Sequence, residues 1–114
     1  MAGLRVIQAW QASYDDPVQV GAGEDLRLTG RTDLWDGHLW QWAVDRTGRE
    51  GWVPDALVRV DDGHSKAAFD YSAQELTCEA GQVLTGLKSL NGWIWCRTED
   101  GMEGWVPERH LEPC

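Results

Sequence analysis

The chain of 114 residues carries ten basic and nineteen acidic side chains, a net charge of −9, together with eight tryptophans. Nucleic acid is a poor partner for this composition, because a phosphate backbone is bound through Lys and Arg. No apolar run reaches the roughly 20 residues of a membrane span. Three cysteines without a C-x-x-C spacing favour a reducing compartment. We therefore expect a cytoplasmic protein that binds neither nucleic acid nor membranes.

The first part of the chain reads as short strands joined by turns. Residues 4–9 form the first predicted strand, since Val6 and Ile7 supply β-branched side chains. Residues 13–25 contain one Pro, two Gly and four acids, which is typical of a long polar loop. The elements expected next are strands at 26–29, 39–44, 50–53 and 58–60, a hairpin turn at 45–48 and a single helical turn at 55–57.

Residues 61–65 are short and polar, so they are predicted to link two domains. The same succession of elements then follows: strands at 67–71, 83–87, 93–97 and 103–106, a polar loop at 72–82, a turn at 99–101 and a helical turn at 108–110. The clearest repeat is Glu-Gly-Trp-Val-Pro, at 50–54 and at 103–107, and in each copy its Gly lies nine residues after the second Trp of a Trp-x-Trp pair. The chain is therefore a tandem duplication.

The repeat predicts an all-β fold with two small five-stranded barrels. The first domain is expected at residues 1–60, the linker at 61–65 and the second domain at 66–114. Units of this size bury only about 60% of their unfolded surface. Large aromatic side chains, of about 150–250 Å² each, help to fill such small cores.

The second copy resembles an SH3 domain from Lys66 to Glu112. Ala67-Ala68-Phe69-Asp70-Tyr71 is similar to the family's A-L-Y-D-Y signature, and Gly104-Trp105-Val106-Pro107 to its G-x-x-P motif. The first copy is a diverged version that keeps Trp40 and Gly51-Trp52-Val53-Pro54. In the first copy, the A-L-Y-D-Y signature is replaced by Gln8-Ala9-Trp10-Gln11-Ala12. This alignment places Ala12 at the position of the second Tyr.

This resemblance implies an SH3-like barrel that binds a proline-rich, basic peptide without catalysis. Flat aromatic walls accept the stiff polyproline II ligand, and acids hold a flanking Arg or Lys. In the second copy the resemblance implies a peptide-binding site that consists of Phe69, Tyr71, Glu75, Glu79, Trp93, Pro107 and His110. His110 stands where the family usually has a Tyr. A possible second groove in the first copy comprises Trp10, Trp40, Pro54 and Leu57.

Each of these residues also has a purely structural interpretation. Phe69 and Tyr71 share one strand face and either line a groove or belong to the core. Glu75 and Glu79 are either ligand contacts or solvated loop charges. Trp93 is favoured for the groove and Trp95 for packing. The first copy lacks two walls, so we expect it to be structural or to bind something other than a P-x-x-P peptide.

The alternative function is assembly, in which the two copies pack on each other or form a homodimer and leave no free groove, since exposed aromatic patches are rarely unused. Binding to a cell wall would need export, for which we see no signal. The three His and three Cys have no metal-type spacing. No nucleophile motif is visible. We expect no metal, no cofactor and no enzymatic activity.

Overall fold

The computed structural model describes residues 3–114, so Met1 and Ala2 of the predicted first domain lie outside the described part. It confirms the all-β prediction: strands dominate, and the described residues contain two 3-10 turns but no α-helix. None of the helices in this part is long and apolar enough to cross a membrane. The chain forms two compact units.

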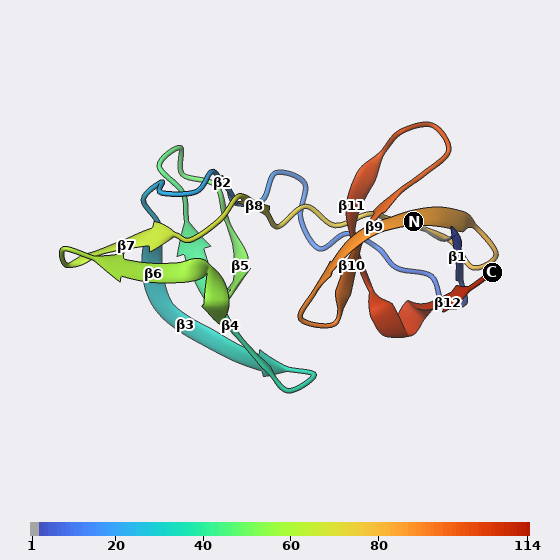
Figure 1. Cartoon of the computed structure of the whole chain (residues 1–114), viewed down its shortest axis with the longest axis horizontal. Helices are drawn as coiled ribbons and strands as arrows, with labels where there is room; N and C mark the ends of the chain where they lie inside the picture. Colours follow the sequence, from blue (N-terminus) through green and yellow to red (C-terminus); the bar gives the residue numbers. More distant parts are fainter. Residues whose placement is uncertain (1–2) are drawn as a thin grey trace. The chain divides into compact units, whose positions relative to one another are not determined.

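Unit 1 consists of Met1–Ser13 and Glu75–Cys114. A five-stranded sheet runs through it in the order β11-β10-β9-β1-β12. Figure 1 shows the blue first strand among the orange and red strands from the end of the chain. The elements are β1 (Gly3–Val6), β9 (Val83–Leu90), β10 (Trp93–Arg97), β11 (Glu103–Pro107), the 3-10 turn η2 (Glu108–His110) and β12 (Leu111–Pro113).

Unit 2 consists of Tyr14–Gln74. Its three small antiparallel sheets have the orders β3-β4-β5, β6-β7 and β2-β8. The elements are β2 (Gln19–Val20), β3 (Arg27–Trp35), β4 (His38–Val44), β5 (Glu50–Pro54), the 3-10 turn η1 (Asp55–Leu57), β6 (Val58–Asp61), β7 (His64–Ala67) and β8 (Tyr71–Ser72).

The compact units do not follow the predicted boundaries, because the two copies exchange their first strands. The predicted linker, 61–65, is a hairpin in which Asp61 pairs with His64 and Val58 with Ala67. This hairpin holds the first strand of the second copy, β7, in unit 2. The first strand of the first copy, β1, instead pairs in unit 1 with β12 and β9. Each compact unit therefore contains residues from both copies.

Hydrogen bonds show which residues of the two first strands are equivalent. The Gly81 N–H donates to the Val6 carbonyl in unit 1, and the Gly23 N–H donates to the Ala67 carbonyl in unit 2. Val6 is therefore equivalent to Ala67, and Trp10 to Tyr71. This corrects the sequence alignment, which placed Ala12 at that position. The error is two residues, because the loop that follows is longer in the first copy.

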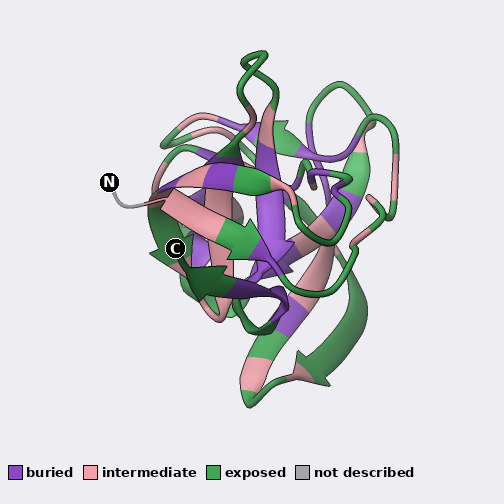
Figure 2. Cartoon of the chain, turned by 90° about the vertical axis from the view of Figure 1, so that its right-hand side faces the viewer, coloured by how far each residue is buried: buried purple, intermediate pink, exposed green. Residues whose placement is uncertain are grey.

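The buried cores of the two units use mostly equivalent positions. Unit 1 buries Val6, Leu76, Cys78, Leu84, Cys96, Val106 and Leu111. Figure 2 shows buried segments alternating with exposed ones on its strands, as expected for strands with one inward face. Unit 2 buries Val18, Val20, Leu26, Ala43, Val53, Leu57 and Ala67. Apolar side chains therefore fill both interiors, and their burial is the main stabilising contribution.

Most predicted strands and both helical turns are confirmed, with small differences at the ends. The first strand is shorter than predicted and ends at Val6. The strand predicted at 26–29 continues to Trp35, where β3 and β4 form a long hairpin. The strand predicted at 67–71 is wrong in its middle, because β7 ends at Ala67 and β8 begins at Tyr71. β8 pairs with the short strand β2, which lies inside the polar loop predicted at 13–25. Pairing between two distant loop segments leaves no periodic pattern in the sequence, so it was missed.

Candidate peptide-binding groove

Three aromatic rings meet in unit 1. Trp10 lies edge-on to Trp93, with ring centroids 5.4 Å apart, and edge-on to His110, with centroids 5.3 Å apart. Such edge-to-face pairs contribute about 0.5–1.5 kcal/mol beyond their buried area. Trp10 and Trp93 are half-buried, whereas His110 is buried. The two indoles are therefore partly exposed, and the imidazole ring that contacts Trp10 is buried.

The backbone positions each of these rings. Trp10 follows β1 and exchanges two backbone hydrogen bonds with Cys78, at 3.0 and 2.9 Å. Trp93 begins β10 directly opposite Pro107, which ends β11 and is fully buried. His110 ends η2, and its Nδ1 lies 3.1 Å from the Gln8 carbonyl oxygen. Pro107, His110 and the two indoles are thus held by the backbone of the same unit.

Glu75 positions Trp10. Its Oε1 accepts hydrogen bonds from Trp10 Nε1 at 3.1 Å, from the Ser13 backbone N–H at 3.0 Å and from Ser13 Oγ at 2.8 Å. Burial raises the pKa of Glu75, and these hydrogen bonds oppose that shift. Glu79 is exposed, and its backbone N–H donates to Gln82 Oε1. The two acids therefore differ: Glu75 orients a wall, and Glu79 is a solvated charge.

The equivalent position in unit 2 is more closed. Tyr71 is 8% exposed and its hydroxyl donates to the Trp52 carbonyl at 3.2 Å. Trp40 is 7% exposed, and its buried Nε1 has no hydrogen-bond partner among the described residues. Pro54 and Leu57 are fully buried. Only Phe69 is half-exposed among these aromatic and apolar residues.

The structure regroups the predicted site residues. Phe69 and Tyr71 lie in unit 2 with Trp40, Pro54 and Leu57, whereas Trp10 lies in unit 1. The predicted seven residues are therefore divided between the two units. In unit 1, Trp10 contacts Glu75, Trp93 and His110, and Trp93 lies opposite Pro107. Glu79 belongs to the same unit.

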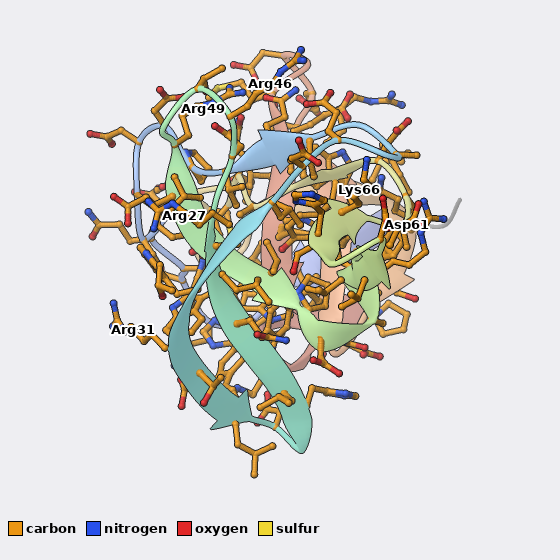
Figure 3. The ribbon with its side chains drawn as sticks, turned by 90° about the vertical axis from the view of Figure 1, so that its left-hand side faces the viewer. Arg27, Arg31, Arg46, Arg49, Asp61 and Lys66 are labelled. Carbon is orange, nitrogen blue, oxygen red and sulfur yellow. The ribbon has the colours of Figure 1, made fainter. Side chains whose placement is uncertain are left out.

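A second aromatic arrangement, which the sequence analysis did not identify as a unit, recurs in both halves. Trp42 and Trp52 face each other across β4 and β5 with centroids 5.1 Å apart, and the Arg31 guanidinium lies 4.9 and 5.0 Å from their ring centroids. Figure 3 shows Arg31 apart from Lys66 and Asp61 of the β6–β7 hairpin. In unit 1 the corresponding residues are Trp95, Trp105 and Lys88. The sequence signal for this arrangement is the second Trp of each Trp-x-Trp pair together with the Trp of the repeated pentapeptide that follows it.

Charge and cavities add two further observations. Unit 2 has six basic and twelve acidic side chains, a net charge of −6, and unit 1 has four and seven, a net charge of −3. A pocket of about 420 Å³ in unit 1 is lined by Gln82, Val83, Thr98, Glu99 and Asp100, and includes none of the predicted groove residues. The described residues contain no cluster of three or more His, Cys, Asp or Glu that could hold a metal ion.

Comparison with known families identifies the second copy. Residues 64–114 match the family model of the variant SH3 domain. Comparison with curated proteins gave no match, and comparison with solved structures gave none either. SH3 domains are in general non-catalytic modules for protein interaction. The match supports an SH3-type domain in residues 64–114, which correspond to the second copy.

Proposed function

We propose that the groove of unit 1 binds a proline-rich, basic peptide segment of another protein. The observation that carries this proposal is the meeting of Trp10 with Trp93 and His110 above Pro107. Two partly exposed indoles over a rigid floor suit a polyproline II ligand, which is already stiff and loses little entropy on binding. The residues of this groove are Trp10, Trp93, Pro107 and His110.

Electrostatics favours a basic ligand. The net charge of −9 raises the rate at which basic segments meet the surface. Glu79 is the exposed acid proposed to attract a flanking Arg or Lys, because Glu75 already accepts three hydrogen bonds within unit 1. We expect micromolar affinity, which corresponds to about 8 kcal/mol. A cytoplasmic adaptor is the setting we propose, supported by three free thiols.

A titration with an Arg-flanked proline-rich peptide, followed by NMR of the indole N–H signals, tests the proposal. We expect the Trp10 and Trp93 signals to shift while that of Trp42 stays in place. Trp10→Ala should weaken binding by about 30-fold, as for a hot spot of about 2 kcal/mol. The matched control is Phe69→Ala, which removes an aromatic wall from unit 2 and should leave the affinity unchanged.

Assembly is the second candidate function, and the closed site of unit 2 favours it there. Trp40 and Tyr71 are nearly inaccessible, so we propose that unit 2 stabilises the protein or its homodimer rather than binding a peptide. No shift in any indole signal of the well-folded protein would exclude the proposed peptide class. Sedimentation at increasing concentration would then test for a homodimer.

A further inference from the structure

The junction between the two copies is a tight turn. Asp62 and Gly63 have φ values of 52° and 78°, and they connect β6 to β7 with Asp61 directly opposite His64. Two-residue hairpin turns of the favoured kind need positive φ at both positions, which Asp-Gly supplies at low cost. Figure 3 shows Asp61 and Lys66 on this hairpin. The last strand of one copy is therefore bound to the first strand of the next.

The alternative topology would keep each first strand in its own copy, pairing β1 with β6 and β7 with β12. By equivalent register, Arg5 would then oppose Arg59 and Lys66 would oppose Glu112. In the observed topology Arg5 opposes Glu112 and Arg59 opposes Lys66. Each topology thus has one like-charge pair and one opposite-charge pair. Cross-strand pairing, which contributes roughly 0.2–1 kcal/mol per pair, does not decide between them.

Chain length does discriminate between the two topologies. Two intervening residues let the Cα atoms of Asp61 and His64 separate by at most about 11 Å. A hairpin satisfies this limit with little loop-closure entropy. It also forms early, because neighbouring hairpins fold within roughly 1–10 μs. Once β7 occupies the edge of β6, β1 has no place there and β12 lacks its partner.

We propose that the Asp62–Gly63 turn forces the exchange of first strands within one chain, so that each groove is assembled from both copies. If the peptide site of unit 1 is as proposed above, its Trp10 wall comes from the first copy and its Trp93 wall from the second. Neither copy then contains a complete set of walls for that groove. The two copies form one obligate binding module.

A disulfide test of topology needs no peptide. A Cβ atom on Gly3 would lie 3.1 Å from the Cys114 sulfur, so Gly3→Cys should form a disulfide with Cys114 in the exchanged topology. The position equivalent to Cys114 in the first copy is Asp61. The matched reporter is Gly3→Cys with Asp61→Cys and Cys114→Ser, and it closes only in the alternative topology. Mild oxidation, non-reducing electrophoresis and mass spectrometry give the readout.

With the natural turn, we expect the first reporter to close within one chain and the second to stay open. We then insert about twelve Gly and Ser residues, which span roughly 20 Å, between Asp62 and Gly63 in both reporters. The ratio of the closed fraction of the second reporter to that of the first should rise by about tenfold. Closure of the second reporter with the natural turn, disulfides between chains, or an unchanged ratio after insertion would each overturn the proposal.

An unmodified chain provides a check if a reporter fails to fold. NMR should show contacts between Val6 and Leu111, which are opposite each other in the observed register. Contacts between Val6 and Val58 would overturn the exchange. Because neither measurement involves a ligand, a failed exchange and a failed peptide site give different results.

Discussion

The two units share a buried framework and differ in the side chains above it. Cys96 and Ala43, Val106 and Val53 occupy equivalent core positions, and all four are fully buried. At the groove position after the repeated Pro, unit 1 has His110 and unit 2 has Leu57. Unit 1 thus places a polar ring beneath two half-buried indoles, whereas unit 2 seals the site with an apolar side chain.

This comparison separates what a duplicated fold must keep from what it can change. The core must fill the same small volume, so equivalent positions stay apolar. Two of the neighbouring aromatic positions have changed residue type, Trp10 to Tyr71 and His110 to Leu57, and the indole of Trp93 is more exposed than that of Trp40. The following experiments change one unit and use the equivalent position of the other as control, in order of expected effect.

Glycine in the repeated pentapeptide should show the largest difference. A Cβ at Gly104 would lie 2.7 Å from backbone atoms of Glu75 and Leu76, whereas at Gly51 it would lie 3.1 Å or more from side chains. Because backbone moves less easily than side chains, Gly104→Ala should cost about 3 kcal/mol and Gly51→Ala about 1 kcal/mol. Urea unfolding measures both. Equal costs would contradict the tighter approach in unit 1.

Asp45 and Thr98 occupy equivalent positions, at the start of the turn that joins β4 to β5 in unit 2 and β10 to β11 in unit 1. Asp45 accepts hydrogen bonds from the Gln19, Thr47 and Arg49 backbone N–H groups, and also from the Thr47 hydroxyl and Arg49 Nε. The Thr98 hydroxyl accepts one from the Met102 N–H and donates to Asp100. Asp45→Ala should therefore cost about 2–3 kcal/mol and Thr98→Ala about 1 kcal/mol. Chemical denaturation of both variants gives the comparison.

Acid should act on the units in opposite directions. Burial alone would raise the pKa of Asp45, but the hydrogen bonds from Thr47, Gln19 and Arg49 lower it to about 2. Its stabilising contribution is complete above about pH 4 and is lost as pH falls toward 2. Burial raises the pKa of Glu75, so protonation of Glu75 favours the folded state.

Urea midpoints between pH 2 and 6 measure this pH dependence. Asp45→Asn should remove part of the loss of stability in acid, and Glu75→Gln should make that loss steeper. The control is Glu79→Gln, which removes an exposed acid of unit 1 and should follow the wild-type curve. An Asp45→Asn curve parallel to that of the wild type would contradict the assigned role of Asp45.

The last and smallest expected difference is in the rate at which the three cysteine thiols are alkylated. Burial, together with the nearby Cys78, raises the pKa of Cys96 to about 11, and burial raises that of Cys78. Cys114 is exposed. Alkylation of the native protein near pH 8 should modify Cys114 rapidly and the other two slowly, because the thiolate is the reactive form. Rapid modification of all three thiols would show that the core of unit 1 opens readily.

Much of the strand order could be predicted from the sequence, but the partners of the first strands could not. The Trp-x-Trp pairs and the repeated pentapeptide define neighbouring antiparallel strands, since their partners lie close in the chain. β1 carries the same apolar pattern whether it pairs with β6 or with β12. The choice depends on the length and conformation of the turn at Asp62, which no strand pattern contains.

The aromatic cluster of unit 1 could be predicted only in part, for the same reason. Trp93, Pro107 and His110 follow from the second copy alone, and the structure brings them together with Trp10. Trp10 was assigned to the other groove because of two errors, a two-residue shift in the alignment and the assumption that each copy folds on its own. The hydrogen bonds of Val6 and Ala67 correct the first error, and the β6–β7 hairpin corrects the second.

The exchanged first strands also couple the two sequence copies. Where two repeats fold separately, a substitution in one leaves the packing of the other unchanged. Here Trp10 of the first copy lies beside Trp93 of the second. For the groove proposed above, a substitution in either sequence copy therefore alters the same site.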